Sequence, residues 1–161
     1  MTMEKTNVKY NAYIKILEEE LRPAMGCTEP IALAYAAAVA RKVLGELPDK
    51  VVIGASGSII KNVKSVVVPN TDHLKGIPAA AAAGIVAGDP DKELEVIASV
   101  EKEAIAEMKE FLEKTPISVE HVDNGFTFEI VVTLYKGEAW SRVRIVNFHT
   151  NIVLILSLIH I

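Results

Sequence analysis

The chain has 161 residues, half of them hydrophobic and 24% charged, with a formal net charge of −4. This length fits one domain, and the apolar content excludes a disordered chain, which could not offset the entropy of folding. A single cysteine excludes a disulfide scaffold and favours a reducing, cytoplasmic location. Basic runs and long apolar runs are absent, so we expect no nucleic-acid partner and no membrane span.

The first half of the chain is predicted to be mainly helical. Apolar residues that recur every three or four positions indicate helices over 11–22 and 92–114. Two alanine-rich helices are expected over 30–44 and 77–87, and they contain so few polar residues that most of their surface should be buried. Val51–Ile53 is an apolar run typical of a buried strand.

The second half is predicted to form strands, because the period of its apolar residues changes to two. Asn124-Gly125 is typical of a tight hairpin turn, and His121 falls on the apolar phase of its strand, where we expect a core histidine. The fold class is therefore α+β, with alanine-rich buried helices and an antiparallel β-meander in the C-terminal half. The strands of the meander are expected over 117–122, 126–135 and 139–147.

The C-terminal end of the chain has two unusual features. Ile152–Ile161 is an apolar run, and native domains seldom end on an unprotected apolar strand. The last six residues also resemble the translation of an adapter used in sequencing libraries. We therefore interpret residues 1–155 as the N-terminal portion of an incomplete domain and residues 156–161 as a non-native tail from a cloning or sequencing adapter. If packing surface is missing, the alanine-rich helices should be incompletely covered.

Cys27 is the first candidate for chemistry. It precedes Thr28, the expected N-cap of the second helix, and the unpaired N–H groups of a helix start favour a thiolate. A thiolate can act as a base, a nucleophile or a metal ligand, whereas the structural alternative is a small buried hydrophobe. No two His or Cys residues have the spacing of zinc ligands, so we expect no self-contained metal site in this chain.

Three polar clusters beside apolar strands are candidates for holding a substrate carboxylate. A glycine-containing turn can bind an anion through backbone N–H groups, and a His-Thr-Asn triplet can donate to a carboxylate. The P-loop spacing is absent, and solvated turns are the alternative. We expect these residues to converge with Cys27 on one cleft. The candidates are Ser56, Gly57, Ser58, Lys61, Asn62, Thr71, His149, Thr150 and Asn151.

Four stretches together resemble a known family. They are Met25-Gly26-Cys27-Thr28-Glu29-Pro30, Ser56–Asn62, Val67–Thr71 and His149-Thr150-Asn151. They resemble the L-cysteine desulfidases, relatives of the iron–sulfur L-serine dehydratases. The resemblance implies β-elimination from L-cysteine or L-serine to give pyruvate, ammonia and, from cysteine, sulfide, with Cys27 as the proton acceptor. It also implies a 4Fe-4S cluster whose cysteine ligands lie in a C-terminal half that this chain lacks.

The resemblance thus implies the N-terminal fragment of an iron–sulfur-dependent lyase, inactive alone, whose partners are a small amino-acid substrate and the missing C-terminal half. Two alternatives stay open: a non-catalytic module that binds a small carboxylate, and a cluster-free thiol enzyme with Cys27 as nucleophile and His149 or His73 as base. A cluster-ligand role for Cys27 also stays open. So do the choice between cysteine and serine as substrate and the existence of a homo-oligomer.

Overall fold

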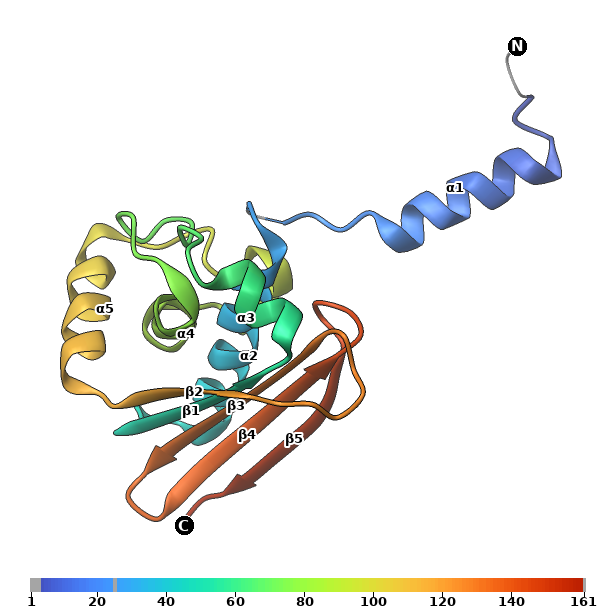
Figure 1. The fold of residues 1–161 in the computed structure, drawn as a ribbon. Coiled ribbons are helices and arrows are strands. Elements are labelled where there is room, and N and C mark those ends of the chain that lie inside the picture. The colour runs from blue at the N-terminus through green and yellow to red at the C-terminus, as the bar shows by residue number, and fades with distance from the viewer. Residues whose placement is uncertain (1–3, 25, 161) are drawn as a thin grey trace.

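The body of the molecule is a five-stranded sheet with helices packed on one face (Figure 1). The structure is a computed structural model that describes residues 4–24 and 26–160. The sheet has the strand order β2-β1-β3-β4-β5, with β1 and β2 parallel and all other neighbours antiparallel. The predicted α+β class is therefore confirmed. In chain order, the elements are α1 (Val8–Glu20), α2 (Thr28–Leu44), β1 (Lys50–Ala55), α3 (Gly57–Val63), α4 (Gly76–Ala87), the 3₁₀ helix η1 (Pro90–Glu95), α5 (Lys102–Lys114), β2 (Ile117–His121), β3 (Glu129–Lys136), β4 (Ala139–Val146) and β5 (Ile152–Leu158).

Small side chains allow α2 to lie between the sheet and α4. A Cβ atom built on Gly84 of α4 would lie only 2.0 Å from the carbonyl oxygen of Ala34 on α2. On its other side α2 packs against β3 and β4, where the Ser141 hydroxyl donates to the Ala40 carbonyl at 2.7 Å. Both alanine-rich helices are buried along most of their length. The expectation that they would be incompletely covered is therefore wrong.

The predicted hairpin between the first two strands of the meander is also wrong. β2 pairs in parallel with β1, and β1 lies between β2 and β3. Parallel pairing is possible because three α-helices and the 3₁₀ helix η1 connect β1 to β2. The chain then crosses the end of β1, where the Val122 N–H donates to the Ala55 carbonyl at 3.0 Å. Gly125 adopts a positive φ of 84°, but within this crossing loop.

His121 is exposed, which corrects its expected place in the core. It ends β2, which is an edge strand whose residues after Ile117 are all exposed. Alternation along the sequence gave no sign of this, because it does not show which strand lies at the edge of the sheet.

The predicted helix over 92–114 is divided in two. Glu93 has a φ of 47° inside η1, and α5 begins only at Lys102. Leu94, Val96 and Ile97 are all buried. In one straight helix, Val96 would lie away from the face that carries Leu94 and Ile97. The Asn70 amide donates to the Ile97 carbonyl at 2.9 Å, and this bond fixes the irregular segment.

α1 stands apart from the body on an extended linker, and none of its residues is buried (Figure 1). It begins three residues earlier than the sequence predicts, because the Asn7 side chain accepts from the Lys9 N–H at 2.9 Å and caps the helix. Within residues 4–24 and 26–160, no helix combines the length and apolar character needed to cross a bilayer.

Candidate functional site

Cys27 lies at the start of α2, as the sequence predicts, but it occupies the N-cap position itself. Thr28, the expected N-cap, is the first helical residue. The Cys27 thiol is exposed and donates to Glu29 Oε2 at 3.2 Å. The buried apolar run that follows in α2 anchors this helix start against the rest of the body. Met25, which begins the six-residue motif, lies outside the described residues.

Glu29 is the centre of a small polar cluster. Partial burial alone would raise the pKa of its carboxyl. Hydrogen bonds from Cys27, from its own backbone and from the Asn62 side chain, together with the charge of His149, nevertheless lower that pKa. Three of the predicted site residues, from the N-cap of α2, from α3 and from the β4–β5 loop, therefore influence one carboxylate.

The electrostatics of this cluster do not favour a thiolate on Cys27. Partial burial of the sulfur raises the pKa of the thiol, and the hydrogen bond to Glu29 raises it further. The helix start was expected to lower this pKa. Burial of the sulfur and the carboxylate two residues away together outweigh that effect, so Cys27 is a thiol near neutral pH in the free chain.

His149 interacts electrostatically with Glu29 and lies in the loop between β4 and β5. Its ring packs against Phe128 with centroids 4.6 Å apart, and its Nε2 is buried and makes no hydrogen bond to the described residues. Burial lowers the pKa of His149, and the Glu29 charge opposes this shift. Burial therefore disfavours the protonated form of His149, and its buried Nε2 is left without a hydrogen-bond partner among the described residues.

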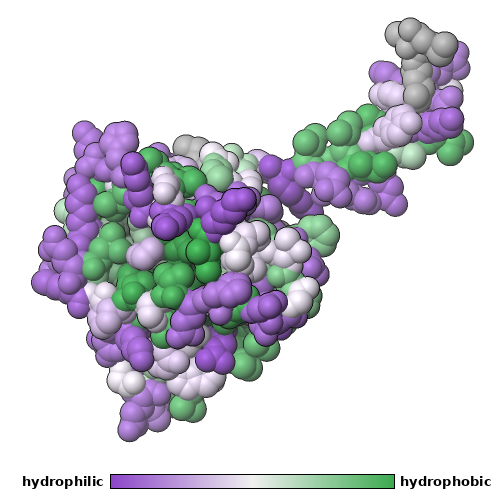
Figure 2. Space-filling view, viewed as in Figure 1, coloured by the Kyte–Doolittle hydropathy of each residue, from purple (hydrophilic) through white to green (hydrophobic). Residues whose placement is uncertain are grey.

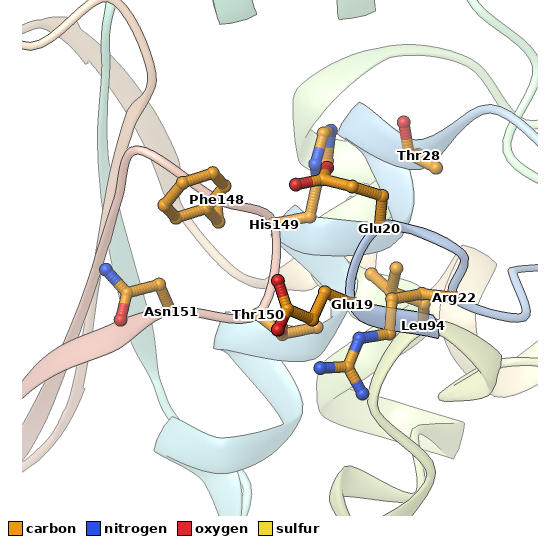
Figure 3. Close-up of a pocket in the computed structure, with 9 residues that line it drawn as sticks. All are labelled: Glu19, Glu20, Arg22, Thr28, Leu94, Phe148, His149, Thr150 and Asn151. Atoms are coloured by element: carbon orange, nitrogen blue, oxygen red, sulfur yellow. The ribbon is translucent and has the colours of Figure 1, made fainter. Parts of the chain in front are cut away.

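A pocket of about 660 Å³ opens beside this cluster (Figure 3). One wall comes from the end of α1 and the linker after it, and the other from the β4–β5 loop and the start of α2. The pocket contains carboxylates, a guanidinium and hydroxyl and amide groups, so its lining suits a small charged ligand. The lining residues are Glu19, Glu20, Arg22, Thr28, Leu94, Phe148, His149, Thr150 and Asn151.

The hydroxyls of the Ser56-Gly57-Ser58 turn bind the protein backbone. Ser56 is buried, donates to the Thr127 carbonyl at 2.8 Å and accepts from the Glu129 N–H at 3.1 Å. Ser58 also donates to the Thr127 carbonyl. These side chains hold the β2–β3 loop, and neither lines the pocket.

The remaining candidates divide between the pocket and the turns. Thr71 is buried and donates to the Val68 carbonyl at 2.7 Å, which closes a turn. Asn151 lines the pocket, but its amide donates to the Val146 carbonyl at 2.9 Å. Thr150 lines the pocket, while Gly57 and Lys61 are exposed on α3. The structure thus gathers Cys27, Asn62 and the His149–Asn151 loop, and it places the serines and Thr71 in supporting positions.

Sequence reasoning missed the role of one buried acid. Glu129 at the start of β3 is fully buried, and its Oε1 lies 2.7 Å from Arg144 Nε. The Asn124 amide also donates to both of its oxygens. Asn124 therefore forms hydrogen bonds to the Glu129 carboxylate as well as being part of a turn. The pairing of β3 with β4 brings Glu129 and Arg144 together. The residues next to each of them in the sequence therefore do not predict this ion pair.

Comparison with known proteins gives relatives that are named UPF0597 proteins. The chain is 54% identical to one from Desulfitobacterium hafniense over 153 residues, which are 95% of this chain and 36% of the relative. It is 43% identical to one from Treponema denticola over 155 residues, or 96% of this chain and 36% of the relative. A third, from Lachnoclostridium phytofermentans, is 48% identical over 143 residues, or 89% and 34%.

The chain spans only about a third of the length of these relatives. No model of a known protein family matches it. No solved structure matches it either. The homologues of this chain are therefore UPF0597 proteins.

Proposed function

We propose that this chain is the N-terminal portion of an iron–sulfur-dependent lyase that catalyses β-elimination on L-cysteine or L-serine. The observation that carries the proposal is the meeting of Cys27, Asn62 and His149 at the Glu29 carboxylate, beside a pocket. A carboxylate can pair with a substrate ammonium, and the amide and imidazole can bind its carboxylate. The resemblance to L-cysteine desulfidases supports the same assignment.

Cys27 is the proton acceptor in this proposal. The α-proton moves to Cys27 Sγ, and the electrons of the C–H bond form a double bond to the β-carbon. Sulfide leaves with the electrons of the C–S bond, or water leaves from serine after protonation of its hydroxyl. The aminoacrylate that remains is hydrolysed to pyruvate and ammonia.

Glu29 links substrate binding to the activation of Cys27. The thiol must lose its proton before it can act as a base, and the Glu29 charge opposes that loss. A substrate ammonium beside Glu29 would neutralise this charge and lower the pKa of Cys27. The thiolate would then form only when substrate occupies the site.

A 4Fe-4S cluster does not fit the donor set of this chain. Such a cluster needs several thiolates, and Cys27 is the only cysteine in the sequence. The described residues also contain no group of three or more His, Cys, Asp or Glu side chains that could hold a metal ion. The proposal therefore assigns the cluster ligands to the polypeptide that the relatives carry beyond the matched third. This chain contributes substrate binding and proton transfer.

The test uses the chain continued to the full length of its relatives. We expect visible iron–sulfur absorption after anaerobic reconstitution, and sulfide release from L-cysteine. Cys27→Ser should reduce turnover at least about 100-fold with the absorption nearly intact, since a hydroxyl is too weak an acid to supply the base. Lys109→Ala, which breaks only a surface ion pair with Asp72, is the control and should leave turnover unchanged. Loss of absorption in the Cys27 variant would instead make Cys27 a cluster ligand.

A second candidate is the cluster-free thiol enzyme, favoured by the position of His149 next to Glu29. A neutral imidazole could take the Cys27 proton and leave a nucleophilic thiolate. Release of sulfide by the 161-residue chain alone, without iron, would support the cluster-free thiol enzyme. The absence of such release, together with activity of the full-length protein, would select the lyase.

A further inference from the structure

α1 carries an apolar face, and none of its side chains is buried. We define the α1 stripe as Tyr10, Tyr13, Ile14, Leu17 and Leu21, whose spacing places them on one side of the helix. Tyr13 is 55% exposed, Leu17 49% and Leu21 68%. Figure 2 shows hydrophobic residues exposed on the projecting helix, away from the body.

A helix of this kind needs a partner to be stable. Isolated helices shorter than about 12–15 residues are marginal in water, even when they are rich in alanine. α1 has 13 residues, no buried side chain and one exposed ion pair, Lys15 with Glu19 at 3.9 Å. Exposed pairs of that type contribute only about 0.3–0.5 kcal/mol. Packing of the stripe is therefore the main source of stability available to it.

The helix belongs to the region shared with the relatives. The match with the Treponema denticola protein covers 155 of the 161 residues, which leaves six outside it. Because α1 begins at Val8, a match that omits six residues at the N-terminus still contains all of it. The same relative has 64% of its own length beyond the match, since the chain covers 36%.

We propose that the α1 stripe docks into an apolar groove with a basic rim on this further polypeptide, within the same molecule. Glu18 and Glu20 flank the stripe on its two sides, so lysine or arginine side chains would complement them. The binding mode is an amphipathic helix in a groove. A covalently linked groove meets α1 at an effective concentration in the millimolar range, which favours it over a second copy of the chain.

Hydrogen exchange tests this docking without reference to any reaction, so its outcome is separate from that of the lyase proposal. The amides of Tyr10–Leu21 are followed in the 161-residue chain and in the chain continued to the full length of its relatives. We expect exchange in the longer protein to be slower by at least about tenfold and independent of protein concentration. Equal exchange in the two proteins overturns the proposal. Protection that grows with concentration in the 161-residue chain also overturns it, because the occupant is then a second copy.

Paired variants locate the contact on the helix. In the longer protein, Ile14→Asp combined with Leu17→Asp should remove the protection of α1. Lys15→Ala, on the opposite side, should leave it within about twofold. Protection of the α2 amides serves as the check on folding of the body in both variants. Unchanged protection in the stripe variant, with α2 intact, contradicts the proposal.

Discussion

At the scale of single residues, burial and the Glu29 carboxylate together keep the only thiol protonated. Cys27 donates to Glu29 at 3.2 Å, and both the burial of the sulfur and this bond raise the thiol pKa. A raised thiol pKa means that the reactive thiolate is scarce at neutral pH and becomes abundant only at higher pH. Cys27 in the free chain should therefore react slowly with electrophiles.

Glu29→Gln should make Cys27 more reactive at neutral pH. The change removes the negative charge and supplies an N–H donor to the thiolate, so the thiol pKa should fall and the burial contribution should remain. The measurement is the rate of alkylation by iodoacetamide against pH, whose midpoint should move to lower pH than in the parent chain. Glu113→Gln on exposed α5 is the control and should leave the midpoint in place. An unchanged midpoint in the Glu29 variant would show that burial alone sets the pKa.

Sequence reasoning reached the position of Cys27 but not its protonation state. The helix start at Thr28 follows from local capping preferences and can be predicted from adjacent residues. The charge balance depends on Asn62 and His149, which come from other elements and meet Glu29 only after folding. The two serines show the same limit, because their acceptor is the Thr127 carbonyl of a distant loop.

At the scale of elements, the contact between α2 and α4 depends on the absence of a side chain at Gly84. A Cβ there would lie 2.0 Å from the Ala34 carbonyl oxygen, well inside any tolerable distance. The backbone of α2 would have to move, and α2 also packs against β3 and β4. Overpacking at this crossing would therefore disturb both layers.

Gly84→Ala should destabilise the fold although alanine favours helices. We expect a loss of at least about 2 kcal/mol in the free energy of unfolding, because overpacking typically costs about 1–3 kcal/mol and the clash involves backbone. Thermal unfolding should report a fall of roughly 4–8 °C in Tm. Gly57→Ala is the matched control: its nearest atom would be His121 Nε2 at 3.5 Å, an ordinary contact. A Gly84 variant as stable as this control would contradict the close crossing.

Elements with a strong local pattern could be predicted, and their partners could not. The alanine-rich segments of α2 and α4 and the alternation in β3 and β4 identify those elements directly. The place of β1 between β2 and β3 follows from long-range packing of the helices that connect β1 to β2. The local sequence Asn124-Gly125 therefore predicts a hairpin, but these residues belong to a loop that crosses the end of β1.

At the scale of the whole molecule, the chain consists of a packed body and an arm. The core joins α2, α4 and the inner face of the sheet, while α1 buries no side chain. The end of α1 and the linker after it line the pocket with Glu19, Glu20 and Arg22, opposite the β4–β5 loop. These three side chains are exposed, and charged groups at the surface contribute little to stability because they remain hydrated.

Deletion of residues 1–22 from the 161-residue chain should leave the stability of the body nearly unchanged. The free energy of unfolding, measured by chemical denaturation and followed at Trp140, should change by less than about 0.5 kcal/mol, the usual range for surface changes. In the chain continued to the full length of its relatives, the same deletion should lower stability, because the α1 stripe would lose its groove. A fall of more than about 1 kcal/mol in the short chain would mean that α1 packs against the body, contrary to its complete lack of buried residues.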